Sequence, residues 1–174
     1  MKIHTYIIVI LLLGFSLQMQ AQKTESSNIK YAISIENNFL GTAEGYFSAD
    51  FAFIHSLTIN KKHAIGLGFG VGLDIEILLM VETNPVYCPV FVNYRYYFTT
   101  NKLSPFINFS LGGNMYENAG KMQSSLSVGF KKGVFVLSSG VFLQAFQAKS
   151  FYFDSTSDGK YFPLGFTLKV GVTF

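Results

Sequence analysis

The sequence has no tryptophan, a single cysteine and few charged residues, and each shortage excludes a class of protein. Cys88 has no second cysteine to pair with, so an internal disulfide framework and a cysteine-based metal cluster are both excluded. Charged residues make up 13% of the chain, about half the share in an ordinary globular domain. The formal net charge of +3 is small and scattered along the chain, which argues against nucleic acid as a partner.

Long apolar runs are also missing, although hydrophobic residues make up 49% of the chain. Beyond the amino-terminal segment, no run reaches the roughly 18 residues of a transmembrane helix. In that segment, Lys2 precedes the apolar run Tyr6–Phe15, and Ala21 offers a small residue for cleavage. The run is too short to cross the roughly 30 Å hydrocarbon layer as a helix. We therefore predict a cleaved signal peptide over residues 1–21 and one domain over residues 22–174.

Phenylalanine, tyrosine and glycine are abundant, with 19, 10 and 16 copies. This composition favours β structure over helix. Between Leu164 and Phe174, apolar residues occupy one parity up to the last residue, and Gly, Thr and Lys occupy the other. Such alternation predicts a strand with one apolar and one polar face. The pattern recurs in seven earlier segments, which gives eight expected strands at 29–39, 46–59, 64–75, 86–98, 105–115, 122–130, 134–146 and 162–174.

The connections between these segments alternate in length. Short ones lie at 60–63, 99–104 and 131–133, longer ones lie at 76–84, 116–121 and 147–161, and the first, at 41–45, is intermediate. No segment has the period of an amphipathic helix. Short turns that alternate with longer loops are typical of a barrel whose two ends face different environments. The sequence thus predicts an all-β, eight-stranded antiparallel up-and-down barrel.

The size of the apolar side chains decides which face of this barrel is outside. An eight-stranded barrel has an interior just wide enough for its side chains, and Phe, Tyr, Leu, Ile and Val on nearly every apolar-face position would overfill it. A solvent face of Gly, Ser, Thr and Asn would be unlike a soluble protein's surface. The expected strands also meet the roughly 9–11 residues that a tilted strand needs to cross a bilayer. Closure leaves no unpaired edge in lipid, so we predict a transmembrane barrel.

Three stretches carry a resemblance to a known family: Pro89–Phe98, Pro105–Phe109 with Leu111–Gly113, and the chain's ending with Val172 and Phe174. With them, the whole mature chain resembles the small eight-stranded outer-membrane barrels of Gram-negative bacteria, the OmpA/OmpX-like group. The resemblance implies the outer membrane as location and its lipid as partner. It also implies that Val172 and Phe174 form a signal read by the barrel-assembly machinery. It implies no cofactor and no particular task, because such barrels serve many purposes.

The polar face contains a row of glycines that suggests a register for the third and fourth strands. A symmetric loop would set Gly66, Gly68, Gly70 and Gly72 opposite Arg95, Asn93, Phe91 and Pro89. Strand glycines of this kind make room for larger neighbours. Folding the 99–104 turn in the same way sets Asn108 beside Arg95. A buried guanidinium must be paired or hydrogen-bonded.

The other inward charges suggest a polar network across the lumen. We expect Glu36 and Lys169 to meet where the first and last strands close the barrel, with Asp74 nearer the outer rim. The hypothesis is a plug that fills the lumen, formed by Glu36, Asp74, Asn93, Arg95, Asn108 and Lys169. A filled lumen predicts a structural or surface-interaction role. A narrow pore or a conduit for small hydrophobic molecules remains the alternative.

Catalytic and metal sites find little support in the pattern. His55 and Ser56 are adjacent, so on a strand they face opposite sides and cannot share a proton. His63 falls in a turn expected on the periplasmic side, and no His or carboxylate pair has metal-ligand spacing. We therefore expect that the protein is not an enzyme and that it binds no metal and no cofactor. Cys88 falls on the lipid-facing parity.

Two segments stay undecided at this point. The strand at 134–146 has apolar residues on both parities, so its inward face cannot be assigned. The apolar run Ile77–Val81 lies in a long connection, where it would extend a hairpin or contact lipid or another protein. No binding partner for the longer loops can be read from the residues.

Overall fold

A computed structural model describes residues 28–42, 45, 47–75, 85–116, 120–147, 160–161 and 163–174. The predicted signal peptide and the run Ile77–Val81 lie outside these described residues. The alternating segments form long strands whose bounds agree with the sequence to within a few residues. They are β1 (Ile29–Thr42), β2 (Phe47–Ile59), β3 (His63–Asp74), β4 (Val86–Tyr97), β5 (Leu103–Met115), β6 (Gly120–Lys132), β7 (Phe135–Gln147) and β9 (Leu164–Thr173). A short strand of two residues, β8 (Lys160–Tyr161), precedes β9.

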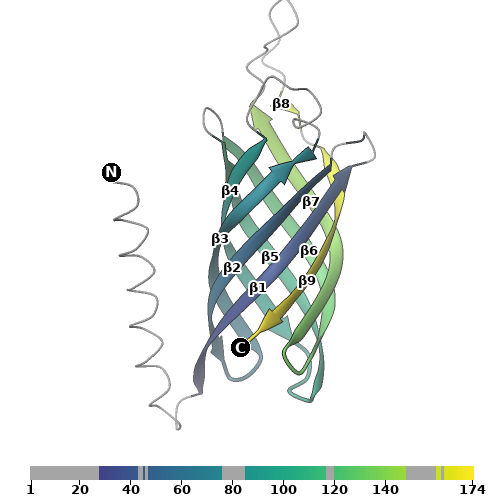
Figure 1. Ribbon diagram of the computed structural model, residues 1–174. Helices are drawn as coiled ribbons and strands as arrows, with labels where there is room; N and C mark the ends of the chain where they lie inside the picture. Colours follow the sequence, from purple (N-terminus) through teal and green to yellow (C-terminus); the bar gives the residue numbers. More distant parts are fainter. Residues whose placement is uncertain are drawn as a thin grey trace, which may run out of the picture.

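Eight of these strands close into a barrel (Figure 1). β1 to β7 pair in chain order, each antiparallel to the next, and β9 pairs with both β7 and β1. The two-residue β8 pairs only with the end of β7, within a stretch that the sequence predicts as loop. The predicted eight-stranded up-and-down barrel is therefore confirmed. In the part of the chain that the structure describes, no helix is long and apolar enough to span a membrane.

The strand registers fix the tilt of the barrel. A line of directly paired residues starts at Ala32 and returns to β1 at Thr42, ten residues further along the chain. Between these ends it passes through Ser56, Gly66, Asn93, Ser110, Ser125, Phe142 and Gly165. With ordinary strand spacing and rise, this stagger tilts eight strands by about 40° from the barrel axis. The diagonal course of the strands is visible in Figure 1.

One rim holds the short turns and the other holds the ends of the longer connections. Asn60 and Lys61 have φ angles of 52° and 59°, the left-handed conformation that a tight two-strand turn requires. At the same rim the backbone of Phe174 exchanges hydrogen bonds of 2.8 and 3.2 Å with Ile33. We call this end the turn rim and the opposite end, where β1, β3 and β5 finish, the loop rim.

The inward parity of β7, undecided in the sequence, is set by one aromatic side chain. Phe142 is 1% exposed and points inward with Val136 and Ser138, while Val141 and its neighbours on the other parity face outward. Phe142 fits because Gly165 lies opposite it, where a Cβ atom would overlap the Phe142 ring. The smallest residue on β9 thus makes room for a large one on β7.

The predicted register of β3 and β4 is wrong by two residues. Gly66 lies opposite Asn93, Gly68 opposite Phe91 and Gly72 opposite Tyr87. Arg95 therefore lies opposite Ala64 rather than a glycine. The reason is steric, because a Cβ atom on Gly68 would overlap the Phe91 ring and one on Gly72 would overlap the Tyr87 ring. The two bulky rings need the glycines directly opposite them, and this requirement determines the register of β3 and β4.

Candidate functional site: the polar lumen

A carboxylate and a guanidinium form an ion pair inside the barrel. Glu36 on β1 and Arg95 on β4 are separated by β2 and β3, yet Oε1 and Nη2 lie 2.6 Å apart. Their side chains are 1% and 4% exposed. The guanidinium also lies 4.6 Å from the centre of the Phe106 ring. Close pairing and an aromatic face together compensate the cost of removing the Arg95 charge from water.

A set of amide and hydroxyl groups extends this ion pair along the wall of β4 and β5. Asn108 Oδ1 accepts hydrogen bonds from Arg95 Nε at 3.2 Å and from Asn93 Nδ2 at 2.8 Å. Asn93 Nδ2 and Asn108 Nδ2 also donate to Ser110 Oγ, at 3.2 and 3.3 Å. The β4–β5 register places Asn108 directly opposite Arg95, as the short turn between these strands predicts.

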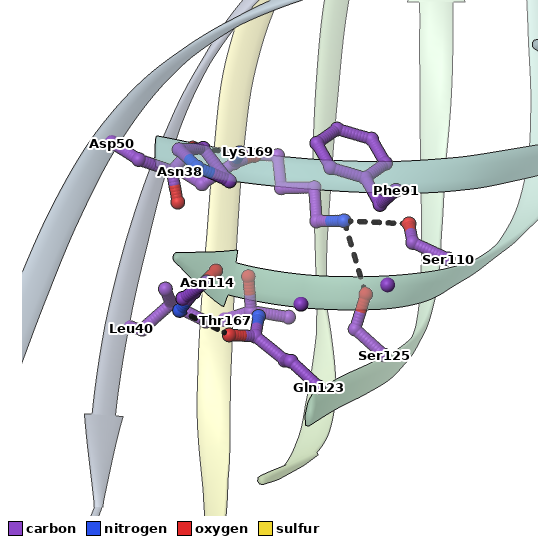
Figure 2. Close-up of a pocket in the computed structure, with 13 residues that line it drawn as sticks. Asn38, Leu40, Asp50, Phe91, Ser110, Asn114, Gln123, Ser125, Thr167 and Lys169 are labelled. Atoms are coloured by element: carbon purple, nitrogen blue, oxygen red, sulfur yellow. Dashed lines mark hydrogen bonds between the residues drawn. The ribbon is translucent and has the colours of Figure 1, made fainter. Parts of the chain in front are cut away.

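Lys169 reaches into the lumen from β9 and bonds to hydroxyl groups on β5 and β6 (Figure 2). Its Nζ donates to Ser110 Oγ at 3.2 Å and to Ser125 Oγ at 3.1 Å. The ion pair of Glu36 with Lys169 expected from the sequence is not found among the described residues. The β1–β9 register explains this, because Lys169 lies opposite Asn38 while Glu36 lies opposite Gly171 and bonds to Arg95.

A second carboxylate, Asp50, lies near Lys169, because Asn38 is paired with Asp50 on one side and with Lys169 on the other. It accepts a hydrogen bond from Asn38 Nδ2 and another, at 3.4 Å, from the hydroxyl of Tyr87. Asn38 and Asp50 are directly paired across β1 and β2, so both point inward at one level. Asp50 was not predicted as a site residue, although its parity in the β2 pattern marks it as inward.

Asp74 belongs to a separate cluster at the loop rim. It is the last residue of β3 and is fully buried. Its Oδ2 pairs with Lys121 Nζ at 3.2 Å and accepts a hydrogen bond from the Tyr116 hydroxyl at 3.2 Å. The predicted rim position of Asp74 is therefore observed, but its contacts are with β6 and the end of β5 rather than with Arg95. Lys121 was missed because the sequence places it in a loop.

A small cavity of about 30 Å³ lies beside Lys169 and Asn38 (Figure 2). Its wall includes the hydrogen bond of 3.1 Å from Asn114 Nδ2 to Gln123 Oε1. Asn38 Oδ1 and Thr167 Oγ1 are buried without a protein hydrogen-bond partner, and both residues line the cavity. One or two water molecules fit a polar space of this size. This cavity therefore offers room for water but for no larger molecule.

The outer face of the barrel has the opposite character. Large apolar side chains are exposed on all eight barrel strands, with Phe166 73%, Leu67 63% and Val128 61% accessible. The inward positions are dominated by Ser, Asn, Thr, Gly and the charged residues described above. A closed sheet with apolar side chains outside and polar side chains inside is suited to a lipid bilayer, because the apolar side chains contact lipid and no backbone group is left unpaired. The chain is a transmembrane β-barrel.

Comparisons with known proteins find similar structures only at low sequence identity. No family model and no curated protein matches the chain. Similar solved structures include the N-terminal barrel domain of Pseudomonas aeruginosa OprF, with 12% identity, a TM-score of 0.44 and coverage of 85% of this chain and 98% of that chain. Neisserial surface protein A has 11% identity, a TM-score of 0.45 and coverage of 84% and 96%. The assignment as a barrel rests on the closed sheet and the apolar outer face of this chain itself.

A larger space opens at the turn rim of the transmembrane barrel. This turn-rim vestibule has a volume of about 370 Å³ and reaches inward to Asn93 and Arg95. Its wall contains hydroxyl groups, three lysines and the buried Ile54 and Tyr97. Because Arg95 is bonded to Glu36 and Asn108, the vestibule ends blindly at the central ion pair.

The two residues that could suggest hydrolysis lie on opposite sides of the barrel wall. His55 faces outward, where Nδ1 is hydrogen-bonded to the Tyr31 hydroxyl and the ring stacks on Phe69 with centroids 5.6 Å apart. Ser56 faces inward, and its hydroxyl donates to the carbonyl of Ala32 at 3.3 Å. A proton cannot pass between them. Among the described residues, no group of three or more His, Cys, Asp or Glu could hold a metal ion.

Proposed function

We propose that this protein is an integral outer-membrane barrel, exported with a cleaved signal peptide over residues 1–21, with a structural or surface-interaction role and a lumen that does not conduct. The support comes from the way the lumen is filled. Glu36, Arg95 and Asn108 are 1%, 3% and 0% exposed. Groups so deeply buried leave no continuous water path along the axis, and an eight-stranded barrel is filled by its own side chains.

A narrow pore or a hydrophobic conduit is the alternative function. The lining argues against the conduit, because the surface that a hydrophobic molecule would have to cross contains Glu36, Arg95 and Lys169. It argues against the pore, because the central ion pair would have to break and hydrate for each passing ion. Neither process is compatible with an intact ion pair between Glu36 and Arg95.

Single-channel recording tests the proposal directly. The mature chain, reconstituted in a planar bilayer, is expected to give no steady conductance steps. A Glu36→Ala/Arg95→Ala double variant removes the side chains that block the axis and serves as the positive control, because it should leak. Steady steps from the unmodified protein would overturn the proposed filled lumen.

Location and assembly form the second part of the proposal. Val172 and Phe174 would act as the signal for the barrel-assembly machinery, since both side chains lie on the outward parity at the end of the closing strand. After expression in a Gram-negative host, the protein should appear in the outer-membrane fraction. Its measured mass should equal that of a chain that begins at Gln22. A folded barrel should also migrate faster on a gel before boiling than after it. A full-length mass in the inner membrane would contradict the proposal.

The proposed role is non-enzymatic. The support is the separation of His55 from Ser56 by the barrel wall, with each already bonded to another group. Expression of the protein should therefore leave the mass of lipid A and phospholipids unchanged. A mass change that disappears in a His55→Ala variant would show that a lipid-modifying activity had been missed.

A further inference from the structure

The turn-rim vestibule is lined by cations from three separate parts of the chain. Lys30 comes from β1, Lys61 from the turn after β2 and Lys131 from β6, while Arg95 forms part of the inner end. Among the described residues that line this space, none has an acidic side chain. Lys30 and Lys61 are exposed, and Lys131 is half-buried with Nζ 6.0 Å from the centre of the Tyr97 ring.

None of these three lysines forms an ion pair with an acidic side chain among the described residues. The ion pairs of the described residues are Glu36 with Arg95 and Asp74 with Lys121, and neither involves a vestibule lysine. Like charges gathered around one space repel each other, and the low-dielectric wall of a cleft strengthens the field inside it. An anion in the vestibule would relieve this repulsion. Hydroxyl groups on the same wall, including those of Thr58 and Thr100, can donate hydrogen bonds to it.

Further lysines at the same rim reinforce the field. The turn rim contains three more lysines, Lys62, Lys102 and Lys132, all exposed, and no acidic residue among its turns. Together with the three vestibule lysines, these residues give the turn rim a positive field that attracts anions.

We propose that the turn-rim vestibule is a binding site for a compact oligophosphate, with Lys30, Lys61 and Lys131 as its charged ligands. The volume of about 370 Å³ is in the range of small-molecule sites. A ligand with two or three linked phosphate groups can reach lysines on several walls at once, which one phosphate cannot. The blind inner end at Arg95 makes this a binding pocket rather than an entrance to a channel. The inference goes beyond the proposed function and does not depend on the membrane in which the barrel resides.

Calorimetry with inorganic tripolyphosphate tests this proposal on the mature chain in non-ionic detergent at low salt. The vestibule variant K30Q/K61Q/K131Q removes three positive charges from the pocket. The control variant K62Q/K102Q/K132Q removes three from the same rim outside the pocket. We expect the dissociation constant to rise at least about tenfold in the first variant and less than about threefold in the second. Equal weakening in both variants would overturn the proposal in favour of diffuse attraction, and absence of binding by the unmodified protein would overturn it outright.

A second measurement needs no substitution and so does not depend on the folding of a variant. An amine-reactive reagent, read out by mass spectrometry, should label Lys30, Lys61 and Lys131 more slowly when tripolyphosphate is present, and Lys62, Lys102 and Lys132 at an unchanged rate. A parallel arm replaces the soluble anion with phosphatidylglycerol vesicles. Protection of the vestibule lysines by the vesicles but not by tripolyphosphate would assign the phosphate to a lipid headgroup and overturn the site for a free ligand.

Discussion

Glu36 and Arg95 form an ion pair of 2.6 Å across the lumen although 59 residues separate them in the chain. The strands that contain these two residues are not neighbours in the sheet. β1 is hydrogen-bonded to β2 and β9, while β4 is hydrogen-bonded to β3 and β5. The contact exists only when the barrel has closed with its observed stagger. The ion pair therefore depends on the complete tertiary structure and in turn ties two separate parts of the wall together.

Replacement of Arg95 by Met should strongly destabilise the barrel. The variant would leave the Glu36 carboxylate buried without its charged partner, and breaking a buried pair in this way costs about 3–5 kcal/mol. Urea unfolding of the protein in lipid vesicles measures the difference. An unchanged midpoint would rule out a structural role for the Arg95 charge.

The double variant Glu36→Gln/Arg95→Met separates loss of the pair from loss of packing. With both charges absent, no unpaired ion remains, so the double variant should unfold at a higher urea concentration than Arg95→Met alone. Lys62→Met serves as the control for loss of a positive charge at an exposed site. It should change the free energy of unfolding by less than about 0.5 kcal/mol.

The glycines of β3 give a second prediction about packing. A Cβ atom on Gly72 would overlap the ring of Tyr87, whereas a Cβ atom on Gly120 in β6 would meet no heavy atom within 4 Å. Overpacking of this kind typically costs about 1–3 kcal/mol. Gly72→Ala should therefore lower the urea midpoint, and Gly120→Ala should leave it nearly unchanged. Similar midpoints for the two variants would show that the Tyr87 ring does not fix the β3–β4 register.

Much of the architecture could be predicted from the sequence because alternation reports directly which side of a strand each residue faces. The size of the apolar side chains then decided that the apolar face is outside. Arg95 and Asn108 could be placed opposite each other because the turn between their strands is short, which leaves few possible registers. The facing of each residue and the register across a short turn depend only on residues that are close in the sequence. The sequence pattern is therefore sufficient to predict them.

The remaining features depend on contacts that a local pattern does not contain. The connection between β3 and β4 is long, so the register there is set by Phe91 and Tyr87 packing on glycines. The partner of Glu36 depends on the stagger of the whole barrel, which brings Arg95 rather than Lys169 to the carboxylate. The inward face of β7 depends on the space that Gly165 leaves for Phe142. In each case the prediction requires the position of residues on another strand, which the sequence pattern of one strand does not contain.

Phe174 gives a prediction about assembly rather than stability. Its side chain is 70% exposed and contributes little to packing, whereas its backbone is bonded to Ile33. If Phe174 is part of an assembly signal, Phe174→Ser should reduce the amount of folded barrel in the outer membrane of living cells. The purified variant refolded in detergent should keep a nearly normal urea midpoint.

Phe166 offers a matched control on the same strand. It is 73% exposed, so Phe166→Ser removes an equivalent lipid-facing aromatic side chain away from the end of the chain. Quantification of heat-modifiable protein in membrane fractions compares the two variants. Equal losses for Phe166→Ser and Phe174→Ser would mean that lipid contact, and not a terminal signal, determines assembly.

Two valines test the membrane position of the barrel wall. Val141 lies at the middle of β7 and is 40% exposed, while Val134 lies in the turn before β7 and is 44% exposed. An arginine on the lipid face costs about 2–4 kcal/mol at the bilayer midplane and about 0–1 kcal/mol near the interface. Val141→Arg should therefore destabilise the barrel in lipid vesicles much more than Val134→Arg, as measured by urea unfolding. Because residue type and exposure are matched, equal effects of the two substitutions would contradict a bilayer centred on the strands.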